Sequence, residues 1–196
     1  MELTELLQVA PFQGMKEEEL VAFLFGVPNS LKHFDPGDII ALQGSLCKGL
    51  YILASGSVRA GMINDEGKEL TVEEISAPSL LASGFVFATE NRFPVNVEAV
   101  EPCEVFIIGK ERFLEFMHLH PLAMQNFIRD ISDRSVFLSR KLNEFALLNL
   151  KDRLLKYLET HSAVHNQQEV AQKLGVTRPS LAKALSELVN DGKIKK

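Results

Sequence analysis

The residues with the most specific chemistry lie near the C-terminus, between Asn166 and Ile194. In the stretch NQQEVAQKLGVTRPSLAKALSELVNDGKI, apolar residues recur at helical spacing on both sides of Gly175, which predicts two short helices joined by a tight turn. Thr177 is expected to cap the second helix, with Pro179 in its first turn. Six polar residues then remain for the outer surface: Gln167, Gln168, Thr177, Arg178, Ser180 and Lys183.

These six side chains suit duplex DNA. Arginine can bond guanine or a phosphate, lysine adds positive charge, and hydroxyl groups at a helix start hold phosphate oxygens. Residues 149–196 carry nine Lys/Arg and five Asp/Glu, whereas the preceding 148 residues carry 12 and 21, within a net charge of −5. A basic module on an acidic body predicts a DNA-binding helix-turn-helix, although an αα-hairpin with a solvated polar face shares the apolar pattern.

The elements upstream must position this module. Residues 1–27 predict short amphipathic helices. Residues 30–108 hold short apolar or alternating runs separated by Gly, Pro, Asn and Asp, which is typical of an all-β roll or barrel. Asp65-Glu66-Gly67 lies between two predicted strands, Val58–Ile63 and Glu69–Ile75, and predicts a hairpin loop with its glycine at positive φ.

A helical period returns at Lys110 and continues past Pro121 to about Thr160, with a break expected at Asn149, which can cap a new helix. Apolar residues recur every seven positions along it, which predicts a heptad seam. The stripe either packs on the β-roll of its own chain or pairs with a second copy, and its width allows both. We expect a parallel homodimer through Phe127, Ile131, Leu138, Leu142 and Phe145.

The fold is therefore predicted to be of the α+β class, with three parts. Residues 1–120 form N-terminal helices and a β-roll sensor domain, residues 121–148 a dimerisation helix, and residues 149–196 the helix-turn-helix domain. No run of about 18 apolar residues and no signal peptide occurs, so we expect a cytoplasmic protein without a membrane partner. Only His33 falls in the predicted roll, which disfavours a cupin-like metal site, and we expect no catalytic residues.

The order of these parts resembles the CRP/FNR family of bacterial transcription regulators, from Leu31 to Ile194. The matching stretches are FDPGDIIALQG, GLYILASGSVRA, NDEGKEL, CEVFIIGKERF and QEVAQKLGVTRPSLAKAL. The resemblance implies a cyclic-nucleotide-binding-like jelly roll and a winged helix-turn-helix in an activator or repressor, with RNA polymerase as a further candidate partner. After Ile194 the wing is either very short or cut off.

By the same resemblance, Arg178 and Lys183 are similar to family positions that reach bases or nearby phosphates, while Thr177 and Ser180 resemble backbone contacts. Pro179 replaces a base-contacting glutamate of the founding member. The operator sequence of that member is therefore not expected to carry over.

The effector site departs from the family's cyclic-AMP pattern. Ser83 stands where the pattern has a ribose-binding glutamate, and Pro94-Val95 stands where it has an Arg-Ser pair. Losing the arginine removes a charge-assisted contact of about 1.5–3 kcal/mol, so cyclic AMP is disfavoured unless a register shift brings Arg92 to the phosphate. The predicted effector pocket is correspondingly less polar and consists of Leu81, Ser83, Phe85, Arg92, Phe93, Val95, Leu138 and Ser139.

Two alternatives to this prediction stay open, haem sensing and action through protein partners. An iron–sulfur cluster is disfavoured because the chain has two cysteines, Cys47 and Cys103, where about four are needed. Haem could occupy an apolar pocket, as in family members that sense nitric oxide or carbon monoxide, but none of the five histidines sits in a motif that marks a ligand. The chain could also act through protein partners without DNA.

Overall fold

The structure, a computed structural model, describes residues 3–26, 31–64, 69–161 and 163–194. It divides into two compact units, which we describe separately. The first comprises Met1–Ala60 and Glu74–Val136, and the second comprises Gly61–Glu73 and Phe137–Lys196. The boundary between the units falls within the longest helix rather than at residue 120 or 148.

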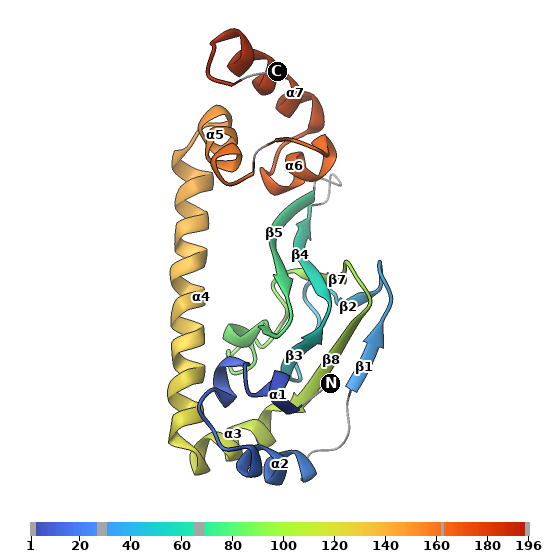
Figure 1. Cartoon of the computed structure of the whole chain (residues 1–196), viewed down its shortest axis with the longest axis vertical. Coiled ribbons are helices and arrows are strands. Elements are labelled where there is room, and N and C mark those ends of the chain that lie inside the picture. The colour runs from blue at the N-terminus through green and yellow to red at the C-terminus, as the bar shows by residue number, and fades with distance from the viewer. Residues whose placement is uncertain (1–2, 27–30, 65–68, 162, 195–196) are drawn as a thin grey trace. The chain divides into compact units, whose positions relative to one another are not determined.

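The β-roll consists of two four-stranded sheets (Figure 1). The first has the order β1 (Leu31–Phe34), β8 (Cys103–Gly109), β3 (Gly49–Ser55) and β6 (Ser79–Leu81). The second has the order β2 (Ile39–Ala41), β7 (Asn96–Ala99), β4 (Ser57–Ile63) and β5 (Glu69–Ser76). The pairs β1–β8, β3–β8, β3–β6 and β2–β7 are antiparallel. This arrangement confirms the predicted jelly-roll architecture, while the expected hairpin loop Asp65-Glu66-Gly67 lies outside the described residues.

The core of the roll is built largely on β3 and β8, which are paired neighbours in the first sheet. Ile52 is paired with Phe106 across the strands, and both are buried together with Leu50, Leu53 and Val105. The turn after β3 requires glycine at position 56, since its φ is +81° and a Cβ atom would lie 2.4 Å from the Pro102 carbonyl oxygen. Local turn chemistry therefore sets where these strands end.

Helices close one end of the roll, and an aromatic cluster holds them together. They are α1 (Leu3–Leu6), the 3₁₀ turn η1 (Ala10–Phe12), α2 (Glu17–Phe25) and α3 (Lys110–Leu119). Phe23 stacks on Phe116 with ring centroids 4.0 Å apart, and Phe12 contacts both rings. A further 3₁₀ turn, η2 (Ser83–Phe85), follows β6.

The long helix α4 (Pro121–Leu147) packs its first half on the roll. Phe127 is 3% exposed and meets Phe113 and Phe87 edge to face, with centroids 5.1 and 5.9 Å away. The assignment of Phe127 to the dimer interface is therefore wrong, because its ring is already covered by its own chain. Ile131 is half-buried against the same core.

The second unit contains α5 (Leu150–Thr160), α6 (Gln167–Lys173) and α7 (Arg178–Asn190). The predicted break before α5 is confirmed. Asn149 caps α5, because its side-chain oxygen accepts a hydrogen bond of 3.1 Å from the Asp152 amide. Only Leu148 and Asn149 separate α4 from α5.

Replacing Asn149 with alanine removes this cap and is expected to lower the free energy of unfolding of the second unit by about 1 kcal/mol. Asn149→Ser, which keeps a capping oxygen, is expected to retain most of that stability. Amide hydrogen exchange along α5 measures the effect directly. Equal protection of α5 in the alanine and serine variants would contradict the role of the cap.

Candidate DNA-binding site

Two capped helices joined by the four residues 174–177 make up the predicted helix-turn-helix. Asn166 caps α6, its side-chain oxygen accepting from the amides of Gln168 and Glu169 at 3.0 and 3.3 Å. Thr177 caps α7 in the same way, accepting from the Ser180 amide at 3.4 Å. The two hydroxyl groups of Thr177 and Ser180 are also hydrogen bonded, at 2.9 Å. The predicted cap at Thr177 is confirmed.

The turn between the helices depends on Gly175. Its φ is +62°, in the left-handed region that glycine enters without strain. A Cβ atom there would lie 3.1 Å from the Leu70 side chain and 3.3 Å from the Phe145 ring, both within the second unit. Both the backbone conformation and the neighbouring side chains therefore disfavour any residue other than glycine in this turn.

The buried face of α7 fixes which residues point outward. Leu181, Ala184 and Leu188 are buried in a core with Leu154 and Val170. Five of the predicted DNA-binding residues are exposed, and Gln167 is half-buried; the exposed set is Gln168, Thr177, Arg178, Ser180 and Lys183. The structure therefore gathers Thr177, Arg178, Ser180 and Lys183 on the outer face of the first two turns of α7.

Ion pairs neutralise the acidic side chains of this module. Lys151 of α5 meets Glu187 at 2.9 Å and Asp191 at 3.3 Å, near the C-terminal end of α7. The hydrogen bond from Lys151 lowers the pKa of Glu187, and the same bond raises the pKa of Lys151. Glu169 pairs with Lys173 at 2.9 Å. Arg178 lies at the opposite end of α7 from Asp191, and Lys183 lies between them, one turn before Glu187.

Arg153 is a positioning residue that sequence reasoning missed. Its guanidinium Nη1 donates to the Leu174 carbonyl oxygen at 2.7 Å and lies over the Phe145 ring, 5.2 Å from the centroid. It thereby ties α5 to the turn before α7. No sequence signal marks this contact, because an arginine on a helix face is usually solvated.

Comparison with known proteins agrees with this architecture. Residues 31–120 match the family model of the cyclic nucleotide-binding domain. The chain is similar to the cyclic AMP receptor protein of Thermus thermophilus, with 25% identity over 191 residues that cover 94% of this chain and 87% of the relative. It is also similar to the cAMP-activated global transcriptional regulator CRP of Pasteurella multocida, with 22% identity covering 74% and 76% of the two chains.

Among solved structures, the c-di-GMP responsive global regulator CLP of Xanthomonas campestris has the same fold. The TM-score is 0.74 at 20% identity, with 90% of this chain and 93% of the other covered. Residues 31–120 thus match a cyclic nucleotide-binding domain, and the chain as a whole resembles transcription regulators of the CRP/FNR type. No helix in the described part of the chain is long and apolar enough to cross a membrane.

Several residues of the predicted effector pocket serve as internal contacts of the first unit. Ser83 is buried, and its hydroxyl donates to the Asp130 carboxylate of α4 at 2.5 Å. The Arg134 guanidinium donates to the Leu80 carbonyl oxygen at 3.4 Å. Together these bonds link β6 and η2 directly to α4.

The remaining pocket residues do not all face one cavity. Leu81 and Phe93 are buried, and Phe93 meets Tyr51 edge to face at 5.0 Å, whereas Phe85 and Val95 are half-buried. Arg92 is exposed and donates to the Gly44 carbonyl oxygen at 2.6 Å, so its guanidinium holds a loop. Leu138 and Ser139 are exposed residues of the second unit.

Three of the five histidines, which are the candidate haem ligands, contact other side chains of the chain. His33 pairs with Glu104 at 3.2 Å, His120 lies 4.5 Å from the Phe116 ring, and His161 stacks on Tyr157. No group of three or more His, Cys, Asp or Glu side chains that could hold a metal ion occurs in the described part of the chain.

The two cysteines are also poor redox centres. Cys47 and Cys103 are free and buried. Desolvation raises the pKa of both thiols, which disfavours the reactive thiolate. We therefore attribute a packing role to each.

Ser83→Ala is expected to lower the free energy of unfolding of the first unit by roughly 1–2 kcal/mol, because Asp130 loses its hydroxyl donor in a partly buried setting. Ser132→Ala is the matched control, since that exposed hydroxyl only bonds the Ile128 carbonyl within α4. Thermal unfolding of both variants tests the link. A Ser83→Ala protein as stable as the Ser132→Ala protein would show that the bond contributes little.

Proposed function

We propose that this protein is a homodimeric, sequence-specific DNA-binding regulator of the CRP/FNR type, controlled by a signal received in the β-roll. The observation that carries the proposal is the outer face of α7. Thr177, Arg178, Ser180 and Lys183 are exposed together there, opposite the buried Leu181 and Leu188. A helix of this kind enters the major groove with its N-terminal residues at the bases.

The second half of α4 supports the dimer. Leu138 and Leu142 are 44% and 68% exposed, and Ile128 and Val136 are exposed as well. Ile128 and Leu142 are fourteen residues apart and Leu138 lies four before Leu142, which are coiled-coil spacings, with the small polar Ser135 at the intermediate position. An exposed apolar stripe of this length suits a second α4, and a two-fold dimer would place two copies of α7 on half-sites about one DNA turn, roughly 34 Å, apart.

The signal is proposed to differ from cyclic AMP. Ser83, which stands at the family's ribose-binding position, is engaged with Asp130, and Arg92 is engaged with Gly44. A cyclic nucleotide would have to break these bonds to gain its own. The protein is further proposed to act in the cytoplasm, where activation of transcription would need contact with RNA polymerase.

Arg178→Ala is expected to weaken binding to a selected operator by about 1–3 kcal/mol, since it removes a bidentate base or phosphate contact. Arg140→Ala, the same charge change at an exposed position of α4, is the control. Fluorescence anisotropy with operator and random duplexes at fixed salt measures both. Equal affinity of the two variants would remove Arg178 from the DNA contact, and no binding of the parent protein to any duplex at low salt would favour action through protein partners instead.

Leu138→Glu is expected to dissociate the dimer at micromolar concentration, because it places a charge in the apolar seam. Leu114→Glu changes a leucine of similar exposure on α3 and is expected to leave the dimer intact. Sedimentation equilibrium distinguishes the two. A dimeric Leu138→Glu protein would contradict the seam.

A further inference from the structure

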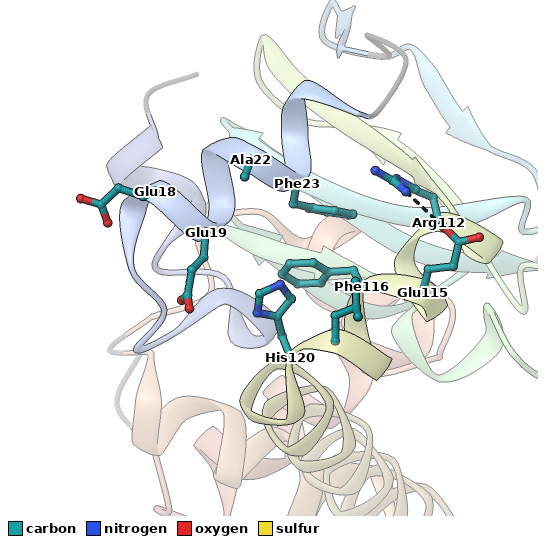
Figure 2. A pocket seen from close by; sticks show the side chains of 9 residues that line it. Glu18, Glu19, Ala22, Phe23, Arg112, Glu115, Phe116 and His120 are labelled. Carbon is teal, nitrogen blue, oxygen red and sulfur yellow. Dashed lines mark hydrogen bonds and ion pairs between the residues drawn. The ribbon is translucent and has the colours of Figure 1, made fainter.

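An open cleft lies between α2 and α3 in the first unit, where neither the sequence motifs nor the proposed DNA contact places a function (Figure 2). Its volume is about 460 Å³, which falls within the usual range for small-molecule sites. Residues from both helices line it, together with His120, the residue before α4.

The floor of the cleft is a column of stacked groups. The Arg112 guanidinium lies over the Phe23 ring, 5.9 Å from the centroid. Phe23 stacks on Phe116 at 4.0 Å, and Phe116 contacts the His120 imidazole at 4.5 Å (Figure 2). Leu119, which is 78% exposed, adds an aliphatic wall. A ligand in the cleft therefore meets mainly apolar and aromatic surface.

The rim of the cleft is acidic. Three carboxylates line it, from Glu18, Glu19 and Glu115, against the single guanidinium of Arg112. Glu115 already pairs with Arg112 at 3.1 Å, which leaves Glu18 and Glu19 on the α2 side as the excess negative charge. An anionic ligand would be repelled there, whereas a cation would be attracted.

Arg112 itself shows how this surface holds a cation. Its charge is matched by the Glu115 carboxylate, and its planar head rests over an aromatic ring. The α2 side of the cleft offers the same two components, carboxylates beside apolar surface. Charge complementarity thus points to a ligand with a positive head and an apolar stem.

We propose that the α2–α3 cleft binds a small organic cation, with an ammonium or guanidinium head on an apolar stem. The stem lies across Phe116, His120 and Leu119, and the head lies on the α2 side, beside Glu19 and within the negative field of Glu18. Because His120 directly precedes Pro121, the bound ligand contacts the residue immediately before α4.

Three probes of nearly equal shape test the proposal on the full chain: 3-phenylpropylamine, 3-phenylpropanol and 3-phenylpropionate. Amide and aromatic NMR shifts locate binding, and titration gives the affinity. The amine is expected to shift resonances of Phe23, Phe116 and His120 and to bind at least threefold more tightly than the alcohol, with the carboxylate weakest. Equal binding of amine and alcohol would overturn the assignment of a cation, and the absence of shifts at these residues would overturn the site.

Paired charge variants give the second measurement. Glu18→Gln/Glu19→Gln is expected to reduce amine affinity about three- to tenfold and to leave the alcohol unchanged. Glutamine at position 19 can still accept the hydrogen bond from the Lys16 amide that caps α2. The control, Glu17→Gln/Glu111→Gln, removes two exposed charges from the same helices outside the cleft and is expected to change affinity less than twofold. Equal losses in both variants would overturn the proposal.

Discussion

The packing of the first half of α4 on the β-roll is the constraint on which the other features of this protein depend. Ala123 and Phe127 are buried in the core of the first unit, and Asp130 and Arg134 hydrogen bond to the segment around β6 and η2. Each of these contacts fixes the rotation of α4 about its own axis. Once that rotation is set, Ile128 and Val136 of the same unit have no choice of face and stay exposed.

The same contacts have a bearing on how a signal could act in this protein. The link between the roll and α4 is made by side chains of the chain itself, with the Ser83 hydroxyl and the Asp130 carboxylate in direct contact. A ligand that acts on α4 must therefore compete with this link or reinforce it. Because a ligand shifts an equilibrium only through its difference in affinity for two states, the strength of the Ser83–Asp130 bond limits what weak effectors can achieve.

Much of the fold could be predicted from the sequence because its signals are local. Turn residues mark the ends of the strands. Asn149 and Thr177 cap their helices by accepting a hydrogen bond from the amide three residues later. Position 175 requires glycine because its φ is positive. The exposure of Arg178 and Lys183 follows from helical periodicity. The heptad pattern, in contrast, could not assign Phe127, because a repeat of seven does not tell which apolar position faces the chain's own core.

The sequence could not predict contacts between residues that are far apart along the chain. Ser83 and Asp130 are 47 residues apart, and Arg92 and Gly44 are 48 apart, so no spacing rule connects them. The cleft between α2 and α3 joins segments separated by the whole roll. Composition also could not predict which charges of the C-terminal module are paired. Lys151 of α5 forms ion pairs with Glu187 and Asp191 at the end of α7.

The exposed leucines of α4 bear on how the occupancy of a DNA site would depend on the concentration of the protein. In the proposed dimer, a partly exposed seam would place the dissociation constant near the working concentration of the chain, and pairing would then follow mass action. Below that concentration, occupancy of a two-half-site operator rises with the square of the monomer concentration. The concentration of the regulator would therefore itself control transcription. A twofold change in its synthesis would change operator occupancy about fourfold before any ligand is bound.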